Sequence, residues 1–101
     1  MRAVRYVTEA RAELLHEVEY FTAISPALGR RFDEAVQKAE ALAAEFAELG
    51  APYKYGTRRL FPGRFKFSIV YLVRSNEVVV IALAPFKRRP GYWRARASAA
   101  V

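Results

Sequence analysis

Apolar residues recur at helical spacing through the first half of the chain. Between residues 8 and 24 they lie four and then three positions apart, at Leu14, Val18 and Phe21. This spacing predicts an amphipathic helix, with the Thr8 hydroxyl as its N-terminal cap. The helix is expected to end at Ser25-Pro26, because a residue that precedes proline avoids the helical region.

A second and longer helix is predicted to begin at the same dipeptide, with Ser25 as its cap and Pro26 in its first turn. Its apolar residues alternate between spacings of four and three, as in a heptad: Leu28, Phe32, Ala35, Ala39, Leu42, Phe46 and Leu49. Gly50 is a natural stop for this helix. We predict that the stripe faces the core and that the two helices form an antiparallel hairpin. A coiled-coil homodimer along the stripe is the alternative.

The period changes to two in the second half of the chain. Residues 65–73 place apolar side chains at every second position, which predicts a strand. Ser75-Asn76 then separates this strand from residues 78–84, which are apolar throughout and should have both faces covered. Shorter strands are predicted at residues 4–7 and 57–61.

These elements predict one α+β domain over residues 1–101. It has an N-terminal strand, a helical hairpin, a three-stranded antiparallel meander and a basic C-terminal tail. The hairpin can cover only one face of the sheet, so Val70 and Leu72 on the other face need a different cover. The tail, with Tyr92 and Trp93 folded back, is one candidate. A second copy of the chain and a partner protein are the others.

Charge is divided unevenly between the two halves. The 101 residues include 17 Lys and Arg against 10 Asp and Glu, for a formal net charge of +7. Residues 1–53 hold six basic and nine acidic residues, whereas residues 54–101 hold eleven basic residues and one acid, Glu77. This asymmetry favours a basic face that binds a polyanion or an acidic protein. The carboxylates are expected to be solvated charges on the helix surfaces.

The composition excludes several kinds of chemistry. Cysteine is absent and His16 is the single histidine, which excludes disulfides, a thiolate nucleophile and a His/Cys metal site. The sequence contains no glycine-rich phosphate loop and no clustered carboxylates with metal spacing, so we expect neither a cofactor nor a metal. No apolar run is long enough to span a membrane, and the N-terminus lacks the apolar core of a signal peptide. We therefore expect a cytoplasmic protein without a membrane partner.

A basic and aromatic group of residues is the remaining candidate site. Arginine forks match phosphate geometry, and aromatic rings stack on bases. We predict that the residues that bind a nucleic acid or another target are Arg58, Arg59, Arg64, Lys66, Lys87, Arg88, Arg89 and Trp93. Alternatively, such a site could cleave RNA without a histidine. An arginine would stabilise the negative charge that develops at phosphorus, and a tyrosine would transfer a proton.

The order and spacing of several short motifs resemble the RelE/ParE superfamily of bacterial toxins, over about residues 4 to 96. The motifs that carry the resemblance are Ala10-Arg11-Ala12-Glu13-Leu14-Leu15, Ser25-Pro26-Ala27-Leu28-Gly29-Arg30-Arg31-Phe32, Gly56-Thr57-Arg58-Arg59, Arg64-Phe65-Lys66-Phe67-Ser68-Ile69-Val70-Tyr71 and Arg88-Arg89-Pro90-Gly91-Tyr92-Trp93. The resemblance implies the toxin of a type II toxin–antitoxin module, a class associated with growth inhibition and plasmid stabilisation.

The resemblance implies two target classes. RelE-like members cleave messenger RNA on the ribosome, whereas ParE-like members poison DNA gyrase and are not nucleases. If the chain is a nuclease, the resemblance and the basic pattern give Arg59, Arg64, Arg88 and Tyr92 as its catalytic residues. Two positions depart from the family pattern: Ser68 stands where the nucleases often carry a sheet arginine, and Phe86 stands where relatives often carry a histidine or arginine.

These departures favour a ParE-like gyrase inhibitor over a ribosome-dependent endonuclease. A non-toxic module that binds nucleic acid or protein is the third hypothesis. The expected partner is a cognate antitoxin whose binding segment combines acidic residues, for the basic half of the chain, with a few apolar anchors.

Overall fold

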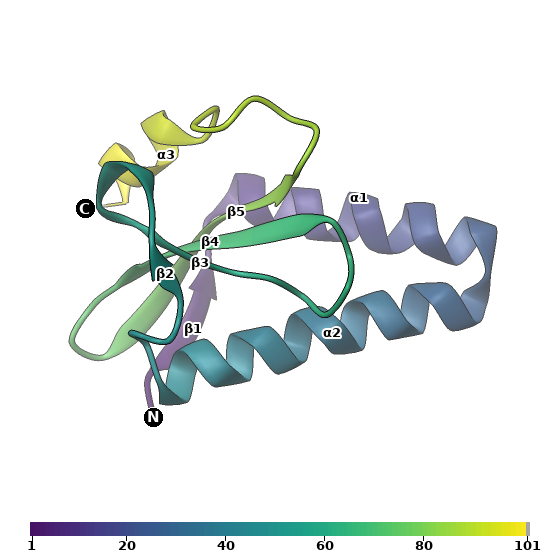
Figure 1. Ribbon diagram of the computed structural model, residues 1–101, viewed down its shortest axis with the longest axis horizontal. Helices are drawn as coiled ribbons and strands as arrows, with labels where there is room; N and C mark the ends of the chain where they lie inside the picture. Colours follow the sequence, from purple (N-terminus) through teal and green to yellow (C-terminus); the bar gives the residue numbers. More distant parts are fainter. Residues whose placement is uncertain (101) are drawn as a thin grey trace.

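Two long helices lie side by side as an antiparallel hairpin (Figure 1). In the computed structural model, which describes residues 1–100, α1 spans Thr8–Ile24 and α2 spans Pro26–Glu45. Ser25 caps α2 as predicted, since its Oγ accepts a hydrogen bond from the backbone N–H of Leu28 at 3.4 Å. The predicted Thr8 cap is wrong: Val7 occupies the N-cap position of α1 and Thr8 is already helical.

The predicted meander is part of a five-stranded sheet. Its order is β1-β5-β4-β3-β2, and β1 runs parallel to β5 while the other pairs are antiparallel. The strands are β1 (Ala3–Tyr6), β2 (Ala51–Pro52), β3 (Arg58–Leu60), β4 (Phe67–Val73) and β5 (Glu77–Pro85). The strand β2 was not predicted, because a two-residue strand that contains proline has no pattern of its own and exists only through its pairing with β3.

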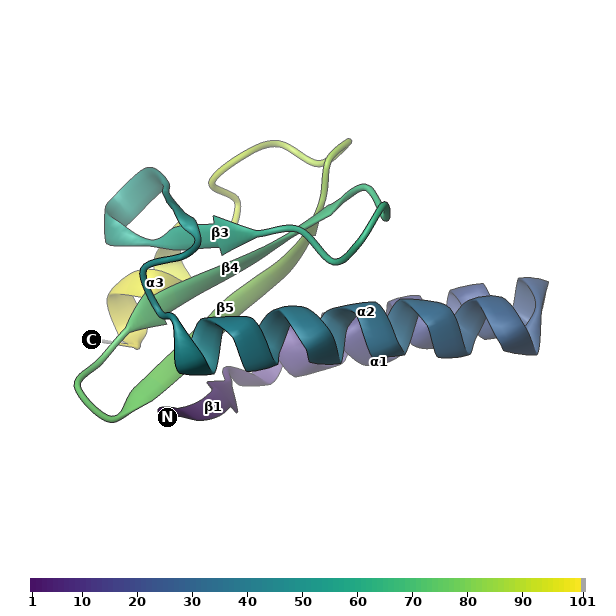
Figure 2. The same cartoon turned by 60° about the horizontal axis from the view of Figure 1, so that its bottom comes forward.

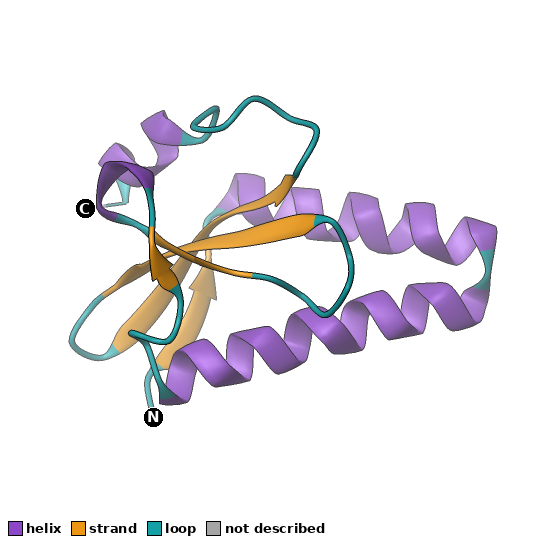
Figure 3. Ribbon diagram, viewed as in Figure 1, coloured by secondary structure: helices purple, strands orange, loops and turns teal. Residues whose placement is uncertain are grey.

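The sheet is covered on both faces, by different parts of the chain (Figures 2 and 3). The helical hairpin covers one face, where Phe32 and Phe67 form the centre of an aromatic cluster. On the other face Trp93 packs with Val70, Leu72 and their neighbours, next to the short helix α3 (Arg94–Ala99). The tail is therefore the cover that this face required.

The predicted core stripe is only partly buried, and the predicted helix stop at Gly50 is wrong, because α2 ends at Glu45 and Phe46 is its C-cap. The side chains that face the sheet are Phe32, Val36, Ala39, Ala43 and Ala47, whereas Leu42, Phe46 and Leu49 are exposed. The reason lies opposite the helix, where the buried ring of Tyr71 fills the space over Ala43 and Ala47. Small alanines fit this space and larger apolar residues would not.

The turn after α2 is held by the same tyrosine. The Tyr71 hydroxyl donates a hydrogen bond to the carbonyl of Ala47 at 2.8 Å and accepts one from the N–H of Gly50 at 3.0 Å. A Cβ at Gly50 would collide with this hydroxyl, so only glycine allows the chain to pass so closely. Neither long helix in residues 1–100 has an apolar stretch that would let it cross a membrane.

Candidate functional site

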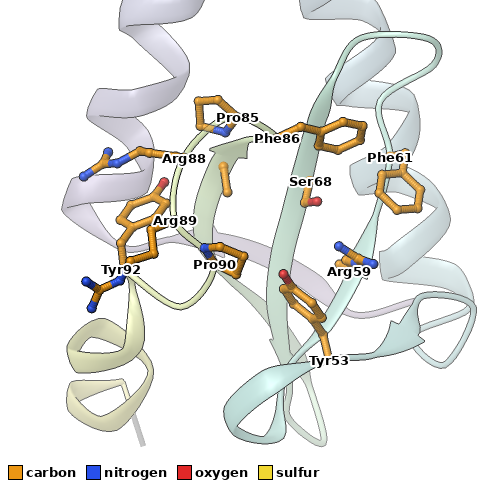
Figure 4. Close-up of a pocket in the computed structure, with 11 residues that line it drawn as sticks. Tyr53, Arg59, Phe61, Ser68, Pro85, Phe86, Arg88, Arg89, Pro90 and Tyr92 are labelled. Carbon is orange, nitrogen blue, oxygen red and sulfur yellow. The ribbon is translucent and has the colours of Figure 1, made fainter.

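A pocket of about 320 Å³ opens between β3 and the loop that leads from β5 to α3 (Figure 4). Ser68 of β4 and Ala84 of β5 form its floor. Four of the residues predicted from the sequence line it together: Arg59, Arg88, Arg89 and Tyr92. Residues near the start and near the end of the basic half of the chain therefore lie close together, because the C-terminal tail turns back across the sheet.

Arg59 forms the β3 side of this pocket. Its guanidinium lies 4.2 Å from the centroid of the Tyr53 ring and 5.2 Å from that of Phe61. Such stacking orients a guanidinium and leaves its N–H edge free for an anion. Within residues 1–100 no carboxylate lies within ion-pair distance of Arg59, so its charge is available to a ligand.

The opposite side of the pocket is organised by Glu13 of α1. One carboxylate oxygen accepts hydrogen bonds from the Leu83 backbone N–H at 3.1 Å and from Arg96 Nη1 at 2.9 Å. The other accepts from the Tyr92 hydroxyl at 2.7 Å and lies 3.7 Å from Arg88 Nη1. Four groups thus converge on a side chain that is only 16 % exposed.

The position of Glu13 follows from the sheet. The strand β1 ends at Tyr6, which pairs with Val80, so β5 has no strand neighbour on that side beyond this point. The Glu13 carboxylate accepts the N–H of Leu83 in place of a strand, which satisfies a backbone donor that would otherwise lack a partner. The expectation that the helix carboxylates are all solvated is therefore wrong for Glu13.

Tyr92 is held in its protonated form. Burial, and then its hydrogen bond to Glu13, raise the pKa of the Tyr92 hydroxyl well above its usual value. The guanidinium of Arg88 lies over the same ring, 3.7 Å from its centroid. A hydroxyl that already donates to a carboxylate and resists ionisation is a poor general base at neutral pH.

The other predicted site residues lie outside this pocket. The guanidinium of Arg58 donates to the backbone carbonyls of Glu48 and Gly50, so it supports the loop after α2. Trp93 is buried in the core, and Arg64 is exposed in the turn between β3 and β4. Lys66 and Lys87 line a second cavity of about 800 Å³ with the exposed His16. Among residues 1–100 no three potential metal ligands are clustered.

Replacing Glu13 with alanine is expected to loosen the tail. The change leaves the Leu83 N–H and the Tyr92 hydroxyl without their acceptor and leaves Arg96 with only the Ile81 carbonyl, and hydrogen bonds to charged groups contribute about 1.5–3 kcal/mol each. We expect a fall of about 2 kcal/mol or more in the free energy of unfolding, measured by urea denaturation. Glu19→Ala, at an exposed position of the same helix, is the matched control. Equal stability of the two variants would contradict the role of Glu13.

Comparison with known proteins agrees with this architecture. Residues 4–95 match the family model described as "ParE toxin of type II toxin-antitoxin system, parDE". Among solved structures, one titled "Chromosomal ParDE TA system from P. aeruginosa" aligns with a TM-score of 0.73 at 20% identity, over 86% of this chain and 98% of that chain. No curated protein sequence matches the chain. The family match covers nearly the whole chain, which therefore belongs to the ParE toxin family of type II toxin–antitoxin systems.

Proposed function

We propose that this ParE-family toxin inhibits bacterial growth by poisoning DNA gyrase, and that it does so without cleaving nucleic acid. Residues 1–101 would then act as one toxin domain in the cytoplasm, where gyrase and its DNA are found. The state of Tyr92 is the observation that carries the proposal. Its hydroxyl donates to Glu13 and its pKa is raised, so at neutral pH it is a poor general base for the proton removal that RNA cleavage requires.

The cation content of the pocket supports the same proposal. Cleavage of a phosphodiester requires several groups that stabilise charge at phosphorus and move protons. Here Ser68 forms part of the pocket floor, where the nucleases that the chain resembles often carry an arginine. Phe86 forms part of the pocket wall, where relatives often carry a histidine or arginine. Arg88 is already engaged with Glu13, which leaves Arg59 and Arg89 as the two cations of the pocket that form no ion pair among residues 1–100.

Translation assays can separate the gyrase proposal from the ribosomal alternative. In a reconstituted bacterial translation reaction we expect messenger RNA to remain intact in the presence of the protein. In cells we expect the Tyr92→Phe variant to arrest growth as the unmodified protein does, because the hydroxyl performs no chemistry. Defined cuts in translated messenger RNA that disappear in Tyr92→Phe or Arg59→Ala would overturn the proposal in favour of an endonuclease.

A toxin of this family has an antitoxin as its partner, and we propose the exposed apolar surface of α2 as its main binding site. This α2 surface consists of Leu42 in the last turn of α2, the C-cap residue Phe46 and Leu49 in the turn that follows, and the last two are each 55% exposed. A groove of about 450 Å³ adjoins it, with Leu42 and Leu60 as apolar lining and with two cations, Arg31 and Lys38, against one acid, Glu34. The surface therefore suits a segment with apolar anchors and acidic residues.

A further inference from the structure

Two phenylalanine rings meet on the surface at the end of the sheet where β3 and β5 finish. Phe61 directly follows β3 and Phe86 directly follows β5, and the two rings are 48% and 53% exposed. Their centroids lie 5.7 Å apart and their planes are almost perpendicular, at 88°. In an edge-to-face pair the edge of one ring lies against a face of the other, so the pair does not cover all of the ring faces (Figure 4).

Cations flank the two rings on both sides. The guanidinium of Arg59 lies 5.2 Å from the Phe61 centroid. Lys66 lies next to Phe86, because the Phe86 N–H donates to the Lys66 carbonyl at 3.0 Å, and Lys87 follows in the chain. The ion pairs found among residues 1–100 involve Arg5, Arg88 and Arg96, and none of them involves these three cations.

The two cavities of this region meet at Phe86. The pocket of about 320 Å³ contains Arg59, Phe61 and Phe86, and the cavity of about 800 Å³ contains Lys66, Phe86 and Lys87. The five residues Arg59, Phe61, Lys66, Phe86 and Lys87 therefore form a continuous surface with a hollow on each side of its central ring. We call this surface the basic aromatic ridge.

We propose that the basic aromatic ridge binds an unpaired DNA strand. Exposed aromatic faces stack on bases of any sequence, and cations at their flanks neutralise the phosphates that connect those bases. Bases within a duplex are stacked on one another and cannot lie on Phe61 or Phe86, so the ridge selects single strands. That the strand is DNA rests on the proposed gyrase target, because the toxin would then meet DNA that gyrase has opened.

Fluorescence anisotropy with a labelled, mixed-sequence oligodeoxynucleotide of about eight nucleotides tests this proposal. We expect the single strand to bind more tightly than the duplex of the same sequence. Three phosphate contacts predict that the logarithm of the binding constant falls with the logarithm of salt concentration with a slope of about −2, since each contact to a single strand contributes roughly −0.7. Loss of one stacked base in Phe86→Ala is expected to weaken binding about tenfold or more.

A charge-matched pair of variants separates a defined site from general attraction to a basic protein. Arg59→Gln and Arg30→Gln each remove one positive charge, but Arg30 is an exposed residue of α2, outside the ridge. We expect Arg59→Gln to weaken binding of the single strand several-fold more than Arg30→Gln does. Circular dichroism of both variants, and of Phe86→Ala, checks that they remain folded.

Three outcomes would overturn the proposal. They are duplex binding as tight as single-strand binding, equal losses in Arg59→Gln and Arg30→Gln, and a marked preference for the oligoribonucleotide of the same sequence. The assay contains no gyrase, so its failure would leave the gyrase proposal intact. A failure of gyrase poisoning would likewise leave the measured affinity for single strands standing.

Discussion

Replacing Trp93 with alanine should lower the free energy of unfolding by about 3–5 kcal/mol, the usual cost of removing a large buried aromatic side chain. The indole is 1% exposed and packs against Val70, Leu72 and Ile81 on the sheet face that the helices leave open. The rings of Tyr53 and Tyr55 also contact it, with centroids 5.8 and 5.7 Å away. Its loss removes the main attachment of the tail to the sheet.

Urea denaturation, followed by far-ultraviolet circular dichroism, measures this effect without relying on the tryptophan signal. Tyr20→Ala provides the matched control, because Tyr20 is an aromatic residue that is 55% exposed on α1. We expect the control to change stability by about 0.5–1 kcal/mol at most. If Trp93→Ala unfolds at the same urea concentration as the control, the tail does not form part of the core.

The double variant Phe46→Glu and Leu49→Glu is expected to weaken antitoxin binding more than about a hundredfold. Truncation of a residue that is central to an interface often costs about 2 kcal/mol or more, and two such residues together exceed a factor of a hundred. The new carboxylates would also repel the acidic residues that we expect in the antitoxin. The variant should remain folded, because both side chains are exposed in the free protein.

Isothermal titration calorimetry with the purified cognate antitoxin measures this change. The control is the double variant Leu15→Glu and Ile24→Glu, which adds the same charges at two exposed apolar positions of α1, 55% and 60% exposed. We expect the control to bind the antitoxin nearly as well as the unmodified protein. If the control instead loses the affinity and the α2 variant keeps it, the antitoxin binds α1 and not the α2 surface.

The main elements of the fold could be predicted because their patterns are local. The turn at Ser25-Pro26 is decided by cap and proline chemistry, and the strands β4 and β5 by runs of β-branched and aromatic residues. The side of α2 that faces the core could not be predicted in the same way. Two adjacent stripes on that helix are apolar, and the choice between them depends on Tyr71, a residue of the sheet that lies opposite.

The candidate site was predicted in composition but not in arrangement. Residue type, together with the resemblance to the RelE/ParE toxins, identified Arg59, Arg88 and Tyr92, which the structure brings to one pocket. Glu13 was missed because its contacts with Leu83 and Tyr92 connect residues at least 70 positions apart in the chain. One feature of the sequence could have indicated that Glu13 is not fully solvated. It lies three positions after Ala10 and directly before Leu14, the two buried residues of α1, and therefore at the border of the buried face of the helix.

The proposal that this toxin poisons gyrase is tested most directly with purified gyrase, plasmid DNA and ATP. We predict that the folded protein causes gyrase to hold double-strand breaks in the plasmid, and that the number of breaks increases with toxin concentration. After the enzyme is denatured and digested, these breaks appear as linear plasmid. The Tyr92→Phe variant should cause the same breaks, and prior addition of antitoxin should prevent them. The toxin concentrations should include those that saturate the antitoxin in a separate binding assay. If gyrase then supercoils the plasmid at its normal rate and no linear DNA appears, gyrase is not the target.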